Sequence, residues 1–85
     1  MKHMKVAFSH KVQFYFGSLL GRDSVDISKT DFTDIAAIVI SESDIAVLDN
    51  EIVKSFDIPV FLVVFDKNVD IDQFMGKVER IIDVS

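Results

Sequence analysis

The polar side chains best placed to do chemistry stand directly after the predicted strands of this chain. They are Ser9, His10, Ser28, Lys29, Ser41, Glu42, Ser43 and Asp66. In open parallel α/β sheets, ligands bind in the crevice outside the carboxyl ends of the strands. A site for phosphoryl transfer, phosphate binding or acid–base chemistry would therefore have to be built from these residues.

Two of these chemistries lack the residues that they need. A phosphate-accepting receiver holds a magnesium ion between acidic residues after its first strand and an aspartate after its third. This chain has Phe8-Ser9-His10 and Ile40-Ser41-Glu42 at those places. A phosphate-binding loop needs several Gly, Ser or Thr amides at a helix start, and only Ser9 precedes the predicted helix. We therefore expect no catalytic, cofactor-binding or metal-binding residue in this chain.

Three weaker options stay open as alternatives. His10 at a helix start would suit a free-standing flavodoxin-like or receiver-like signalling or phosphotransfer domain, although a single histidine in such a place is more often solvated. A small molecule in the crevice would use Ser9, Ser41 and Glu42. Acid–base hydrolysis would use pairs of carboxylates, which an acidic chain brings together by chance; the candidates are Asp31, Asp34, Glu42 and Asp44.

Three consecutive aromatic residues carry a stronger signal. Phe14, Tyr15 and Phe16 lie on a predicted helix, where successive side chains are about 100° apart and the three span about 200°. The buried stripe of a surface helix is narrower, so at least one aromatic ring must point away from the core. Exposed apolar patches mark partner surfaces. We therefore predict an interaction surface formed by Phe14, Tyr15, Phe16 and Leu20.

Composition narrows the class of protein. The chain has 85 residues, enough for a single domain covering residues 1–85. Its net charge of −5 argues against nucleic-acid partners, and neither a polybasic patch nor a long apolar run suggests a membrane partner. The absence of cysteine excludes thiolate chemistry and disulfides, and a small chain without disulfides is expected in the cytoplasm.

Short apolar runs alternate with amphipathic stretches, which predicts an α/β fold. We expect strands at residues 5–9, 24–28, 35–40 and 60–65, and helices at 10–20, from 43 or 44 to 56, and after Asp70. Residues 81–84 either end the last helix or form a fifth strand. The economical arrangement is a flavodoxin-like, receiver-like three-layer fold with four or five parallel strands in the order 2-1-3-4-5. Residues 29–34 leave room for only a single helical turn before the third strand, unless the strands are shorter than predicted.

Two motifs resemble the N-terminal wing domain of bacterial ornithine decarboxylases. The stretch Thr30-Asp31-Phe32-Thr33-Asp34-Ile35-Ala36-Ala37-Ile38-Val39-Ile40 is similar to a D-F-T-D run that leads into a buried strand of that family. Asp57-Ile58-Pro59-Val60-Phe61 is similar to the family's G-I-P-V-F turn. Asp57 replaces the family's glycine, which suggests that this position need not be left-handed here.

The resemblance implies a role in assembly rather than in catalysis. Family members continue into a pyridoxal-phosphate domain, and the lysine that binds this cofactor lies in that later part. The chain is thus expected to be a wing domain belonging to a longer protein, with no cofactor of its own. The parent reaction would be the conversion of ornithine to putrescine and carbon dioxide. The implied partners are other domains of the parent decarboxylase and further copies of the same subunit.

Overall fold

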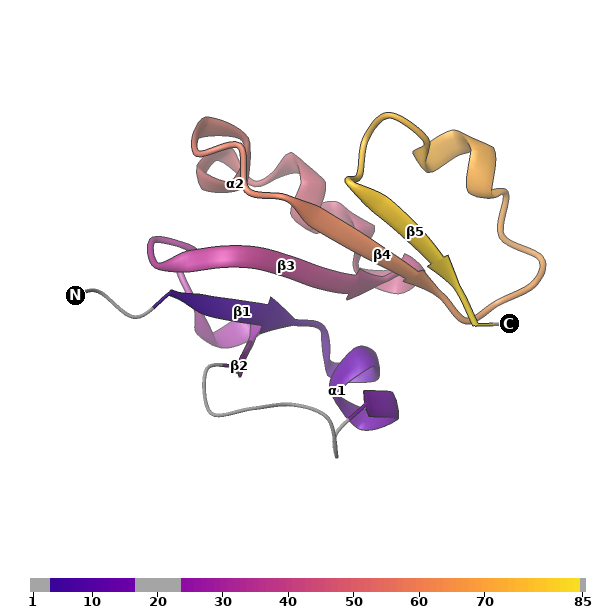
Figure 1. The fold of residues 1–85 in the computed structure, drawn as a ribbon, viewed down its shortest axis with the longest axis horizontal. Helices are drawn as coiled ribbons and strands as arrows, with labels where there is room; N and C mark the ends of the chain where they lie inside the picture. The colour runs from indigo at the N-terminus through magenta and orange to yellow at the C-terminus, as the bar shows by residue number, and fades with distance from the viewer. Residues whose placement is uncertain (1–3, 17–23, 85) are drawn as a thin grey trace.

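The computed structural model describes residues 4–16 and 24–84. It contains one sheet of five parallel strands in the order β2-β1-β3-β4-β5 (Figure 1). This sheet confirms the predicted flavodoxin-like three-layer α/β fold and its strand order. The elements are β1 (Lys5–Phe8), α1 (His10–Phe16), β2 (Ser24–Asp26), η2 (Ile27–Lys29), β3 (Ile35–Ser41), η3 (Glu42–Asp49), α2 (Glu51–Ser55), β4 (Val60–Val64), η4 (Ile71–Phe74) and β5 (Arg80–Asp83).

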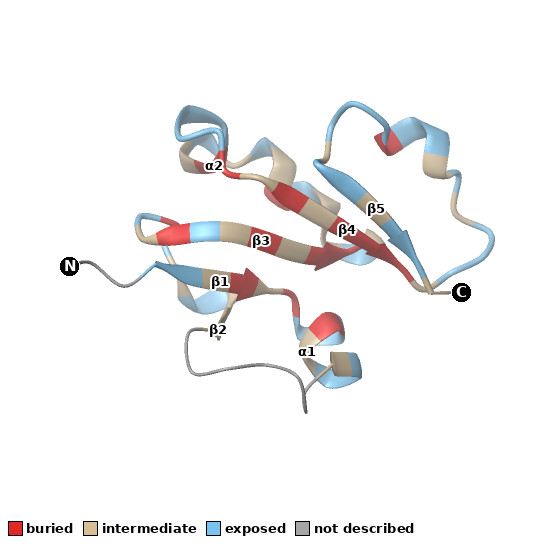
Figure 2. Ribbon diagram, viewed as in Figure 1, coloured by how far each residue is buried: buried red, intermediate tan, exposed pale blue. Residues whose placement is uncertain are grey.

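The core lies on one face of the sheet. Buried residues concentrate in β3 and β4, whereas β5 is half-buried to exposed (Figure 2). Ile38, Ile40 and Leu62 are fully buried, and burying such a side chain stabilises a fold by about 1.5–3 kcal/mol. These strands were predicted from continuous apolar runs, which are typical of parallel strands. The main cluster is formed by Ala7, Phe32, Ile35, Ile38, Ile40, Val47, Val53, Ile58, Val60, Leu62, Val64 and Phe74.

The two faces of the sheet are covered unequally. The connection from β1 to β2 runs in one direction along the sheet, and those from β3 to β4 and from β4 to β5 run in the other. Because such crossovers are right-handed, α1 lies on one face, and η3, α2 and η4 lie on the opposite one. Among the described elements, α1 is the helix on its face (Figure 1).

The D-F-T-D run forms the turn that enters β3. The connection from β2 is the single short turn η2, which begins inside the predicted strand because β2 ends at Asp26, two residues earlier than predicted. Phe32 then adopts a φ of 67°, which is rare for a bulky residue, and its side chain is only 6% exposed. The Phe32 amide donates to Thr30 Oγ1 at 3.1 Å, and the Thr33 amide donates to Asp31 Oδ1 at 3.1 Å. The polar side chains thus satisfy the turn's amides while Phe32 enters the core.

The predicted continuous helix up to residue 56 is wrong. The chain forms the 3-10 helix η3 and then the separate helix α2, because Asn50 between them is extended, with φ −67° and ψ 129°. Asn50 Oδ1 accepts hydrogen bonds from the amides of Ile52 and Val53 at 2.9 and 3.2 Å. Asparagine is a favoured N-cap, so this side chain starts a new helix instead of continuing the old one.

The last predicted helix is also much shorter than expected. Asp70 caps it as predicted, since its Oδ1 accepts from the Asp72 amide at 3.1 Å, but η4 ends at Phe74. The sequence left open whether residues 81–84 end a helix or form a strand, and the chain forms the strand β5 here. Ile81 and Ile82 lie in β5, paired with Leu62 and Val63 of β4.

Asp57 is left-handed, contrary to the expectation from its replacement of glycine. Its φ is 51°, and it follows the end of α2 as the reversing residue of a Schellman motif. The Ile58 amide donates to the Val53 carbonyl at 3.1 Å, and the Asp57 amide donates to the Lys54 carbonyl at 3.3 Å. Aspartate tolerates this conformation better than most residues, so the motif survives the loss of glycine.

We predict that Asp57→Gly stabilises the fold by about 0.5–1 kcal/mol, because glycine adopts a positive φ without strain from a Cβ atom. In a domain of this size, that gain corresponds to a rise in melting temperature of roughly 2–8 °C. Thermal unfolding followed by circular dichroism measures it. Asp57→Ala is the matched control and should lower the melting temperature. A lower melting temperature for Asp57→Gly would contradict the left-handed assignment.

Candidate functional site

Helix α1 is held on its sheet face by specific contacts. Val12, a residue of this helix, is fully buried. Gln13 Nε2 donates to the Phe8 carbonyl at 3.1 Å and to Asp26 Oδ2 at 2.8 Å, which ties the helix to β1 and β2. Lys11 Nζ lies 3.8 Å from Glu42 Oε1. These contacts orient the helix, so the directions of its aromatic side chains are defined.

The three aromatic residues of α1 differ in exposure. Phe14 is 87% exposed and Tyr15 is 57% exposed, whereas Phe16 is half-buried. Tyr15 makes edge-to-face contacts with Phe16 and with Phe65, with ring centroids 4.8 and 5.0 Å apart. Phe14 therefore points away from the core, in agreement with the angular spread of the three rings. Leu20, the fourth predicted interface residue, lies outside the described residues.

The sequence did not predict that Phe65 contacts α1. It follows β4, yet its ring meets Tyr15 of α1, and Lys11 Nζ lies 4.9 Å from the centroid of the same ring. Its amide donates to Glu42 Oε2 at 3.1 Å. The sequence pattern does not predict this contact, because it depends on how closely α1 approaches the residue that follows β4.

The polar residues predicted for the crevice mostly bond with one another. Ser9 and Ser41 are fully buried, and the Ser41 amide donates to Ser9 Oγ at 3.2 Å. Ser41 Oγ donates to Asp44 Oδ2 at 3.1 Å and lies 2.8 Å from Ser43 Oγ. Together with the Glu42 contacts to Lys11 and Phe65, these bonds join the strand ends. These bonds occupy the polar groups with which a ligand in the crevice would have to form hydrogen bonds.

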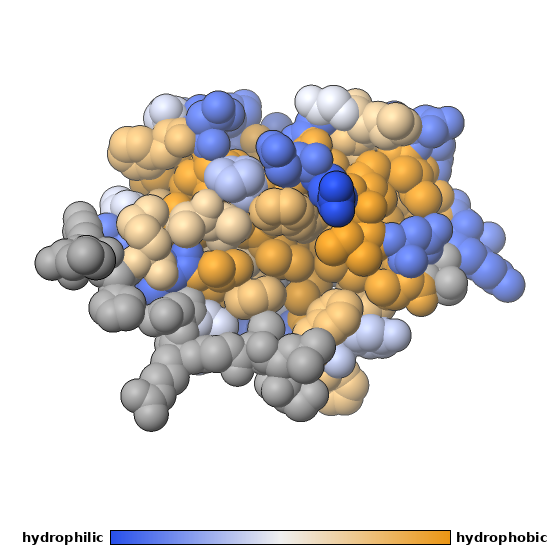
Figure 3. All heavy atoms as spheres, viewed as in Figure 1, coloured by the Kyte–Doolittle hydropathy of each residue, from blue (hydrophilic) through white to orange (hydrophobic). Residues whose placement is uncertain are grey.

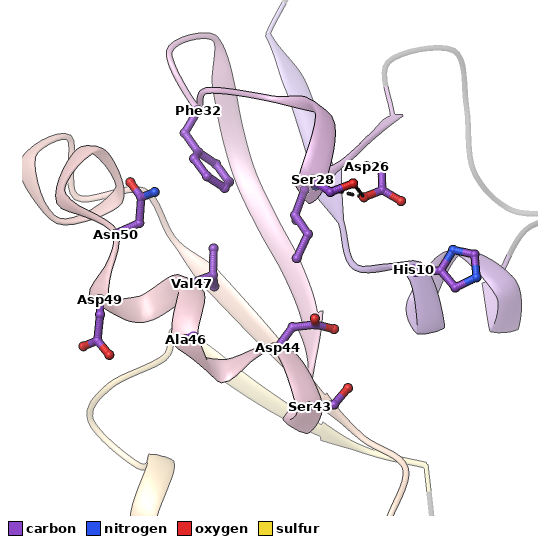
Figure 4. A pocket seen from close by; sticks show the side chains of 11 residues that line it. His10, Asp26, Ser28, Phe32, Ser43, Asp44, Ala46, Val47, Asp49 and Asn50 are labelled. Atoms are coloured by element: carbon purple, nitrogen blue, oxygen red, sulfur yellow. Dashed lines mark hydrogen bonds between the residues drawn. The ribbon is translucent and has the colours of Figure 1, made fainter.

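The remaining candidates do not converge. A hollow at the strand ends is lined partly by His10, Asp26, Ser28 and Asp44, and His10 stands apart on α1 from Ser43 and Asp44 (Figure 4). Within residues 4–16 and 24–84, no group of three metal-ligating side chains lies close enough to hold a metal ion. His10 is exposed at the start of α1, whose described part has seven residues.

The described residues do not fit a pyridoxal-phosphate site. A lysine that binds this cofactor needs a desolvated pocket. All the lysines in the described ranges are exposed at the surface: Lys5, Lys11, Lys29, Lys54, Lys67 and Lys77. No step of a decarboxylation is therefore assigned to these residues.

Two aspartates have lowered pKa values. Hydrogen bonds from the Ser28 hydroxyl and amide, at 2.7 and 2.9 Å, lower the pKa of Asp26, and Gln13 and nearby His10 add to this. The Thr33 hydroxyl and amide, at 2.7 and 3.1 Å, lower the pKa of Asp31 in the same way. Both carboxylates accept hydrogen bonds within turns, Asp26 at the carboxyl end of β2 and Asp31 before the amino end of β3.

We predict a loss of stability in acid that depends on these two groups. Because their pKa values are lower in the folded state, their contribution is present above the ordinary aspartate pKa of about 3.9 and disappears as pH falls through the folded-state values. Urea unfolding at pH values from 6 to about 2 measures the effect. The double variant Asp26→Asn and Asp31→Asn should show a shallower fall than the original chain. An equal fall in both proteins would contradict the assignment.

Comparison with known proteins finds a relative that matches the whole chain. No protein-family model matches the chain. An ornithine decarboxylase from Haemophilus influenzae is 42% identical over 86 residues, an alignment that spans all of this chain. The chain is homologous to the N-terminal domain of this decarboxylase. The resemblance seen in the D-F-T-D and I-P-V-F motifs is therefore confirmed, and it extends over the whole sequence.

The chain spans only 12% of the length of this ornithine decarboxylase relative. The homology thus concerns one N-terminal domain. In this chain, the D-F-T-D turn and the Schellman motif shape the fold of that domain. In the part of the chain that the structure describes, no helix is both long enough and apolar enough to cross a bilayer.

Proposed function

We propose that this chain is the N-terminal, non-catalytic wing domain of a longer, cytoplasmic, pyridoxal-phosphate-dependent ornithine decarboxylase. The observation that carries the proposal is the 42% identity along the full chain to a protein named for that activity. The exposed lysines and the internally bonded crevice agree with it, because they offer no site for the reaction. Conversion of ornithine to putrescine and carbon dioxide, and the cofactor it needs, belong in this proposal to the rest of the polypeptide.

The domain's role in the proposal is to join decarboxylase subunits through α1. Phe14 and Tyr15 are more than half exposed, and the sequence prediction adds Phe16 and Leu20 to this surface. Large aromatic side chains contribute much of the energy of protein interfaces. Lys11, Gln13 and Tyr15 fix the helix on the sheet, so Phe14 is presented on a rigid support. Preorganised anchors of this kind lower the cost of association.

We predict that Phe14→Asp weakens subunit association in the natural polypeptide without unfolding the domain. The side chain is 87% exposed, so folding should change little, whereas a carboxylate in an apolar interface is unfavourable. Sedimentation velocity over a range of concentrations measures association. The matched control is Phe56→Asp, because Phe56 is also largely exposed, at 65%, but lies beyond α2. Equal association of Phe14→Asp and the original protein would refute the role of α1.

A further inference from the structure

One carboxylate, that of Glu42, joins three parts of the fold at the carboxyl end of the sheet. Glu42 follows β3 as the first residue of η3, and its side chain is only 13% exposed. Its Oε2 atom accepts a hydrogen bond at 3.1 Å from the amide of Phe65, which follows β4. Its Oε1 atom lies 3.8 Å from Nζ of Lys11 in α1. The two oxygens thus link α1 to the end of β4 through the end of β3.

The two partners of Glu42 also contact each other and the exposed aromatic rings of α1. Lys11 Nζ lies 4.9 Å from the centroid of the Phe65 ring, which is within the range of a cation–π contact. The Phe65 ring meets Tyr15 edge to face, with centroids 5.0 Å apart. We call the exposed side chains of Phe14 and Tyr15 the α1 surface. A shift of Lys11 or Phe65 would therefore disturb the α1 surface directly.

The surroundings of Glu42 explain why both of its oxygens need partners. In Figure 3, apolar side chains gather over the strands, and α1 lies at the margin of this region. A mostly buried carboxylate is unfavourable beside apolar groups unless it is paired or hydrogen-bonded. The ion pair with Lys11 adds little stability, because the Lys11 side chain is 51% exposed. What the carboxylate supplies is a fixed geometry between α1 and the end of β4.

We propose that Glu42 is the positioning residue of the α1 surface. By holding Lys11 and Phe65 against each other, it fixes the ring of Tyr15 and the direction in which Phe14 is presented. The inference rests on the proposed function, in which α1 joins decarboxylase subunits. Glu42 acts through the other residues and does not need to touch the partner subunit. A surface that is ordered before association loses less conformational freedom when it binds.

A second set of contacts holds α1 in place independently of Glu42. Gln13 Nε2 donates to the Phe8 carbonyl at 3.1 Å and to Asp26 Oδ2 at 2.8 Å, so it ties the helix to β1 and β2. These contacts lie on the side of the helix away from β4. Removal of the Glu42 carboxylate should therefore loosen the side of α1 that carries Tyr15, while the helix stays on the sheet.

Hydrogen exchange in the natural polypeptide, resolved by peptide mass spectrometry, measures how firmly α1 is held. The variants are made in a Phe14→Asp background, which removes any protection of α1 that comes from subunit association. Glu42→Ala should accelerate exchange in α1 about tenfold and leave exchange in β4 unchanged, because only a local opening becomes easier. Glu51→Ala is the matched control, since Glu51 also begins a helix, α2, but is exposed on the opposite face of the sheet.

Two outcomes of the exchange experiment would overturn the inference. One is the same exchange of α1 in Glu42→Ala and in Glu51→Ala. The other is an equal acceleration in α1 and β4, because Glu42 would then stabilise the whole fold rather than position one helix. If Glu42→Ala does not fold, Glu42→Gln takes its place. Glutamine keeps an acceptor for the Phe65 amide but no charge for Lys11, so exchange in α1 should rise by only about threefold, and no rise would again overturn the inference.

Sedimentation velocity of the natural polypeptide, with Phe14 intact, tests the consequence for association. Glu42→Ala should weaken subunit association by about five- to tenfold, because the α1 surface is no longer ordered in advance, and Glu51→Ala should not weaken it. If Phe14→Asp weakens association and Glu42→Ala does not, the inference is overturned and the proposed function stands. If Phe14→Asp leaves association unchanged, the proposed role of α1 is refuted, and the inference falls with it.

Discussion

Leu62→Ala is expected to destabilise the domain by about 2–5 kcal/mol, the range measured for large-to-small changes at buried positions. Leu62 is fully buried at the centre of the sheet and belongs to the main cluster on the helix-covered face. The loss would consume a large part of the stability of so small a domain, which is of order 5–10 kcal/mol. Equilibrium unfolding in urea, followed by circular dichroism, measures it.

Ile82→Ala is the matched control for Leu62→Ala. Ile82 lies on the neighbouring strand β5 but points to the opposite face of the sheet, beside Val63, and it is 40% exposed. Its truncation should cost less than about 1 kcal/mol in the 85-residue chain, because little packing is lost. Similar costs for the two variants would show that the core does not lie on the face assigned to it.

Phe32→Ala is expected to cost about 3–5 kcal/mol, as is usual for the loss of a buried aromatic side chain. Phe32 is 6% exposed and is the residue of the D-F-T-D run that enters the main cluster. The variant keeps a Cβ atom at the same φ of 67°, so backbone strain remains while packing is lost. Urea unfolding measures the change in the free energy of unfolding.

The control for Phe32→Ala separates burial from aromatic character. Phe56→Ala removes an identical ring that is 65% exposed and should change the stability by less than about 0.5 kcal/mol, as is usual at surface positions. If Phe32→Ala were as mild as Phe56→Ala, the D-F-T-D run would not act as a core anchor. The similarity of this run to the decarboxylases would then lack a structural reason.

The sequence predicted the central strands well because their signal is local. The apolar runs at β3 and β4 are continuous, and burial on both faces is the usual reason for such runs. Strand β5 could not be decided in advance, since two adjacent isoleucines suit a helix end as well as a strand. Its assignment depends on pairing with β4, which local pattern does not encode.

The helices were less predictable because capping competes with apolar spacing. The spacing of apolar residues continues across Asn50, so periodicity alone predicts one helix. The side chain of Asn50 caps the amides of Ile52 and Val53 instead, and a new helix begins. Asp57 shows the same limit. Its left-handed φ follows from the hydrogen bonds at the end of α2, although its type did not demand it.

The candidate site was predictable where it rests on helix geometry. The spread of three consecutive aromatic rings requires an exposed one, and Phe14 is that residue. The role of the strand-end residues was not predictable, because it depends on which of their polar groups bond to one another once β1 lies beside β3. That placement brings Ser9 to the Ser41 amide and turns two candidate ligands into a structural bond.

The central proposal is that this chain is the N-terminal, non-catalytic domain of a longer ornithine decarboxylase. The most direct test is immunoprecipitation from the source organism with an antibody raised against the 85-residue chain. The recovered polypeptide is sized, and release of labelled carbon dioxide from ornithine labelled at its carboxyl carbon is assayed on the same beads. We predict a polypeptide several times larger than 9.6 kDa that releases the label, while the purified chain releases none. Recovery of a 9.6 kDa polypeptide without this activity would contradict the claim.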